Sequence, residues 1–115
     1  MTDRPARAAE AAAHIRQLAE ATTDPRNAYA HPAEIAAVTG NLRELARQLE
    51  DALQHLEVHI GRRDAGDWAA PDGEPPRPYA RQARGAVQSA RADAHNLGRA
   101  LDRAVKALDP FKPAP

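Results

Sequence analysis

Residues 35–60, IAAVTGNLRELARQLEDALQHLEVHI, decide the fold of this chain. Apolar residues recur through the stretch at alternating steps of three and four. The row formed by these steps is Ile35, Val38, Leu42, Leu45, Leu49, Ala52, Leu56 and His59, with Leu53 and Ile60 beside it. A heptad pattern of this length predicts a helix over residues 32–60 that packs against a second helix along this row.

Gly40 interrupts the stretch and allows a second interpretation, a DNA-binding helix-turn-helix with the turn at this glycine. Ala36 and Gly40 suit such a turn, and Asn41 with Glu44 could cap a new helix. However, the residue after the turn glycine should be apolar, and it is Asn41. The apolar row also keeps its phase across Gly40. We therefore predict one continuous helix, in which glycine costs ~1 kcal/mol relative to alanine.

Two further helices are expected on either side of this one. Residues 3–23 carry a weak stripe that is mostly alanine. Residues 78–108 repeat the alternating steps, with Ala83, Val87, Ala90, Ala94, Leu97, Leu101, Ala104 and Leu108. The segment 61–77 is rich in Gly and Pro and predicts a long loop, and residues 110–115 predict a short tail.

These elements predict a single all-α domain over residues 1–115. The helices at 32–60 and 78–108 should form a long antiparallel hairpin, because one loop joins two matched apolar rows. The N-terminal helix should lie against the side that carries Leu53 and Ile60, which would complete a three-helix bundle.

Composition excludes several classes of function. The sixteen basic and sixteen acidic residues cancel, so no overall field favours DNA or an anionic membrane. Without cysteine the chain has no disulfide and no thiolate metal site. No signal peptide or membrane span is evident, so we expect a cytoplasmic protein. Ile, Leu, Val and Phe total 17 of 115 residues, which indicates a small core.

Few residues suggest chemistry of their own. The only serine, Ser89, lies within a predicted helix, and no phosphate loop or nucleophile elbow is present, so we expect neither an enzyme nor a cofactor. His55 and His59 have the i and i+4 spacing of metal ligands. The zincin glutamate is absent after His55, so we expect no metal site there.

Interaction residues are easier to nominate. Arg77, Arg84 and Arg91 recur every seven residues, either as a basic stripe for phosphates or as a flank that complements the acidic second helix, and we favour the flank. Trp68 in the loop is interpreted either as a cap on the open end of the bundle or as an anchor for a partner.

The segments HPAEIAAVTGNLRELARQLEDALQHLEVHI and ARGAVQSARADAHNLGRALDRAVKALDPF, separated by a loop, resemble short alanine-rich helical-hairpin proteins of actinobacteria. This resemblance covers residues 31–111 and implies a hairpin fold without implying an activity. The secreted WXG100 hairpins are similar in size and place W-x-G at the bend, where this chain has Trp68-Ala69-Ala70.

The leading functional prediction is a non-enzymatic helical protein–protein interaction or self-assembly module. It would pair with a second copy or another helical protein through Leu53 and Ile60. The alternatives are a nucleic-acid-binding regulator that uses Gly40 or the arginine stripe, and a secreted partner protein like WXG100.

Overall fold

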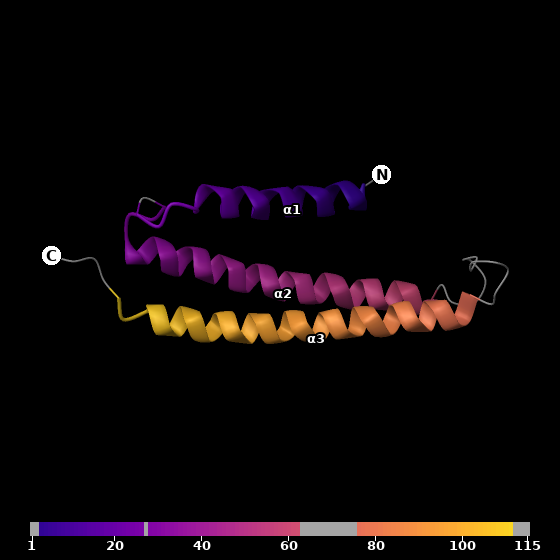
Figure 1. The fold of residues 1–115 in the computed structure, drawn as a ribbon. Helices are drawn as coiled ribbons and strands as arrows, with labels where there is room; N and C mark the ends of the chain where they lie inside the picture. The colour runs from indigo at the N-terminus through magenta and orange to yellow at the C-terminus, as the bar shows by residue number, and fades with distance from the viewer. Residues whose placement is uncertain (1–2, 27, 63–75, 112–115) are drawn as a thin grey trace. The chain divides into compact units, whose positions relative to one another are not determined.

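The computed structural model describes residues 3–26, 28–62 and 76–111, and it contains three α-helices and no strand within those ranges (Figure 1). The helices are α1 (Arg4–Ala21), α2 (Pro32–Arg62) and α3 (Pro76–Leu108). Their ends differ by at most two residues from the ranges expected at 3–23, 32–60 and 78–108. The all-α fold predicted from the sequence is therefore confirmed.

The chain divides into two compact units, residues 1–35 with 111–115, and residues 36–110. In the first unit, the Asp3 side chain caps α1 by accepting a hydrogen bond from the Ala6 amide at 3.2 Å. At the other end the Thr22 hydroxyl donates to the Leu18 carbonyl at 2.9 Å. No residue of α1 is buried, as its alanine-rich stripe leads one to expect.

Helix α2 is continuous across Gly40. Pro32 occupies its first position, where a missing N–H costs nothing, and the Glu34 carboxylate accepts a hydrogen bond from the Ala30 amide at 2.7 Å. Gly40 is in helical conformation without a left-handed φ. The continuous helix is therefore confirmed, and α2 has no turn at Gly40 of the kind that a helix-turn-helix requires.

The second unit contains the antiparallel hairpin of α2 and α3, which lie side by side along their length (Figure 1). Ala46 is fully buried, and a Cβ placed on Gly98 would lie 3.8 Å from the Ala46 Cβ. Two such small residues allow the helix backbones to approach closely. The apolar residues that are buried in the described part of the chain are all alanines, namely Ala46, Ala80 and Ala94.

The face of α2 that meets α3 is not the predicted apolar row. The residues of α2 that contact α3 include Arg43, Glu50 and Glu57, and with Ala46 and Leu53 they form a row in steps of three and four. This contact row is displaced by one residue from Leu42, Leu45, Leu49, Ala52 and Leu56. Leu45, Leu49 and Leu56 are instead 39%, 44% and 49% exposed. The prediction that these leucines form the hairpin interface was wrong.

Candidate interaction surfaces

The leucines that the hairpin leaves uncovered lie on one side of it. Each residue of a helix turns by ~100°, so Leu45, Leu49 and Leu56 all lie to the same side of Ala46 on α2. Leu97, which is 48% exposed, precedes Gly98 on α3 as Leu45 precedes Ala46. Because the two helices run antiparallel, the residue before the contact residue points to the same side of the hairpin on both helices. We call these four leucines the leucine face.

The opposite side of the hairpin is charged. The Arg43 guanidinium donates a hydrogen bond to the Asp102 carboxylate at 2.9 Å, and the Lys106 ammonium lies 3.1 Å from the same carboxylate. The hydrogen bond from Lys106, followed by that from Arg43, lowers the pKa of Asp102 because both favour the charged form. Further along, His95 Nδ1 lies 3.1 Å from the Glu50 carboxylate. The Arg43–Asp102 ion pair and the Glu50–His95 contact therefore join the two helices on this side.

Glu57 is the one buried charged residue among those described. Its carboxylate accepts a hydrogen bond from the Gln88 amide at 2.7 Å, and the guanidinium nitrogens of Arg91 and Arg84 lie 3.1 Å and 3.8 Å away. Arg91 forms an ion pair with Glu57 Oε2, but it is not oriented to donate a hydrogen bond to that oxygen. One hydrogen-bond donor and two guanidinium charges from α3 thus surround one acid of α2.

The arginine stripe of the sequence is explained in part by this cluster. Arg84 and Arg91 serve as counter-charges to Glu57, which agrees with a flank that complements the acidic second helix. Arg77 lies in α3, but its side chain falls outside the described residues, as does the whole of Trp68. The roles predicted for those two side chains remain predictions.

The remaining candidates are placed as follows. Leu53 and Ile60 are half-buried, and Leu53 belongs to the contact row, so both offer less apolar area than the leucine face does. His55 and His59 are exposed. Within the described ranges no group of three His, Cys, Asp or Glu side chains is arranged to hold a metal ion.

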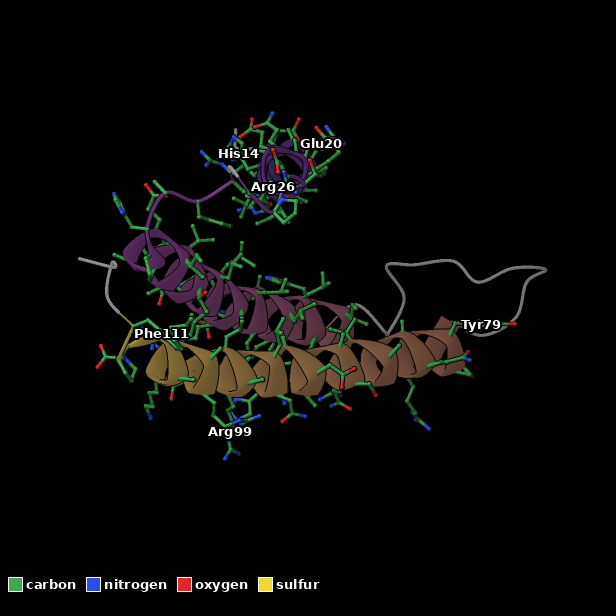
Figure 2. All side chains as sticks on the ribbon, turned by 60° about the vertical axis from the view of Figure 1, so that its left-hand side comes forward. His14, Glu20, Arg26, Tyr79, Arg99 and Phe111 are labelled. Atoms are coloured by element: carbon green, nitrogen blue, oxygen red, sulfur yellow. The ribbon has the colours of Figure 1, made fainter. Side chains whose placement is uncertain are left out.

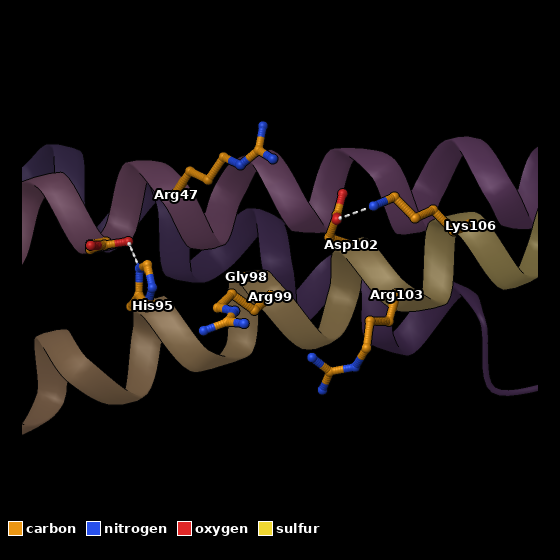
Figure 3. A pocket seen from close by; sticks show the side chains of 8 residues that line it. Arg47, His95, Gly98, Arg99, Asp102, Arg103 and Lys106 are labelled. Atoms are coloured by element: carbon orange, nitrogen blue, oxygen red, sulfur yellow. Dashed lines mark hydrogen bonds and ion pairs between the residues drawn. The ribbon is translucent and has the colours of Figure 1, made fainter.

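A groove of about 430 Å³ lies on the charged side of the hairpin (Figure 3). Its walls are Arg47 and Glu50 from α2, and His95, Gly98, Arg99, Asp102, Arg103 and Lys106 from α3. This groove was not predicted from the sequence. The signal for it was the spacing of Arg99, Arg103 and Lys106 at i, i+4 and i+7, which places three cations along one side of a helix.

The chain matches no family model, no curated protein and no solved structure. Among the described residues, no helix is both long enough and apolar enough to cross a membrane.

Proposed function

We propose that this chain is a non-enzymatic helical module that associates with a second copy of itself through the leucine face. The observation that carries the proposal is the exposure of Leu45, Leu49, Leu56 and Leu97, between 39% and 49%, on one side of a hairpin whose buried apolar side chains, among the described residues, are all alanine. Burial of apolar surface contributes ~25 cal/mol per Å². Covering this face would therefore stabilise the hairpin.

The whole side of the hairpin that carries the leucine face is large enough for a second copy. Residues 36–62 of α2 span ~40 Å at 1.5 Å per residue, and two adjacent helices are together ~20 Å wide. The footprint of that side, ~800 Å², is comparable with the area that each partner buries in an interface of standard size, and the leucine face occupies ~17 Å of its length. Two such hairpins, related by a two-fold axis, present the same patch to one another and form a four-helix bundle.

The test measures the mass of the full chain in solution. Light scattering at micromolar concentration should report twice the 12.4 kDa chain mass. Leu49→Asp should yield monomer, because a carboxylate would be desolvated at the centre of the interface. Val58→Asp is the matched control, since Val58 is 47% exposed and lies half a turn from Leu49 around α2. It should remain a dimer.

A milder variant guards against loss of folding. Leu97→Gln should retain the helical circular dichroism of the wild type and raise the dimer dissociation constant about tenfold or more. A well-folded wild-type monomer at all concentrations would overturn self-association, with the face then covered by another part of this chain or by a foreign helix. Equal dimerisation of Leu97→Gln and wild type would also overturn it.

A further inference from the structure

The groove on the charged side carries positive charge that the hairpin does not neutralise. Asp102 is paired with Lys106 and Arg43, and the Glu50 carboxylate lies 3.1 Å from His95 Nδ1. These two carboxylates face four Arg and Lys side chains in the lining. The guanidinium groups of the other lining cations, Arg47, Arg99 and Arg103, form no ion pair with any residue in the described part of the chain (Figure 3). The groove is therefore locally basic in a chain whose net charge is zero.

These three arginines lie on two helices, and all of them are available to a ligand. Arg47 projects from α2, whereas Arg99 and Arg103 project from α3 (Figure 3). Arg99 extends away from the α3 ribbon (Figure 2), and all three residues are exposed. Gly98 contributes no side chain to the wall between them. Figure 3 shows the Arg47 and Arg103 side chains extending away from one another, so these exposed side chains would rotate toward a ligand that lies between the two helices.

The chemistry of the lining selects the class of ligand. A guanidinium offers a planar fork of donors that matches a phosphate oxygen pair, and the volume lies in the range of sites for small molecules. Arg99 and Arg103 are separated by ~6 Å along the helix axis. One orthophosphate would engage one fork, whereas linked phosphates can engage several. Among the described residues, the His95 imidazole is the one aromatic ring in the lining, and no Phe, Tyr or Trp lines the groove.

We propose that this groove binds a chain of two or more linked phosphates, supplied either by an inorganic polyphosphate or by the phosphates of a nucleotide. The site is independent of the leucine face, because it lies on the opposite side of the hairpin. Dimerisation would leave it open to solvent.

Calorimetric titration of the full chain tests this proposal, with inorganic tripolyphosphate, ATP and orthophosphate as separate probes. Tripolyphosphate should bind saturably at physiological ionic strength and at least tenfold more tightly than orthophosphate. Weaker binding of ATP than of tripolyphosphate would assign the site to inorganic polyphosphate. Tighter binding of ATP would assign it to nucleotides. Absence of saturable tripolyphosphate binding, or orthophosphate binding of equal strength, would overturn the proposal.

Two variants show whether the groove itself is responsible. The double variant Arg99→Gln with Arg103→Gln should weaken tripolyphosphate binding at least tenfold. Arg81→Gln is the matched control, because Arg81 is an exposed arginine on the same side of α3 as Arg99, five turns away and outside the groove. It should bind like the wild type. Equal weakening in both proteins would mean that general charge attracts the ligand, which would refute the site. All variants should keep the wild-type mass, whatever that mass is.

Discussion

Replacement of Gly40 by alanine distinguishes a continuous α2 from a helix that turns. A Cβ built on Gly40 meets no heavy atom within 4 Å, and the residue does not have a left-handed φ. Alanine should therefore gain its full helix propensity, and the free energy of unfolding should rise by ~1 kcal/mol. For a cooperative unit of the size of residues 36–110 this corresponds to a rise in Tm of ~4–8 °C.

Urea denaturation followed by circular dichroism, at one fixed protein concentration, measures the change. Gly85→Ala is the matched control, because Gly85 lies in α3 and its added Cβ would also meet nothing within 4 Å. The two sites are far apart, so the double variant should gain ~2 kcal/mol. If Gly40→Ala loses stability while Gly85→Ala gains it, Gly40 needs a backbone that only glycine adopts, and the continuous helix is refuted.

Two further predictions concern the charged contacts. Glu57→Ala should lower the free energy of unfolding by ~1–2 kcal/mol, because the hydrogen bond from Gln88 and the burial of the side-chain stem are lost. Glu50→Ala removes an exposed contact and should lower it by less than ~1 kcal/mol. Equal losses of the two variants in urea titrations would contradict the role of burial. The pKa of Asp102 is lowered from 3.8, so its stabilisation is present above that pH and is lost as the pH falls through the lowered value. Asp102→Asn should therefore reduce the decline in the free energy of unfolding below about pH 4, as measured in acid titrations. An unchanged dependence on pH in that range would show that the Lys106 and Arg43 contacts do not stabilise the fold.

The sequence predicted where the helices begin and end, because those signals are local. Pro32 at a first helical position and the unbroken phase across Gly40 both reflect propensities that act within a few residues. The antiparallel hairpin also followed from local patterns, since one connection joins two heptad rows. These features required no knowledge of which faces meet.

The pairing of the two faces could not be predicted in the same way. The heptad rule assumes that large apolar residues meet, which favoured Leu45 and Leu49 as the interface. The structure instead places Ala46 against Gly98, where small size allows close approach. Around them are hydrogen bonds and ion pairs that depend on partners ~30 to 60 residues away in the chain. The groove was missed for the same reason, because Arg47 joins its lining only once the register is known.

A hairpin whose buried apolar side chains, among the described residues, are alanines has a calorimetric consequence. The heat capacity change of unfolding arises mainly from apolar surface that becomes exposed to water, while polar surface reduces it. Unfolding an isolated hairpin of this kind would expose little apolar surface that was not already hydrated, since Leu49 and its neighbours are half-exposed from the start. Its stability would consequently vary little with temperature, with a broad and shallow maximum. Burial of the four leucines in a dimer would increase the heat capacity change of unfolding, and the free energy of unfolding would then vary more steeply with temperature.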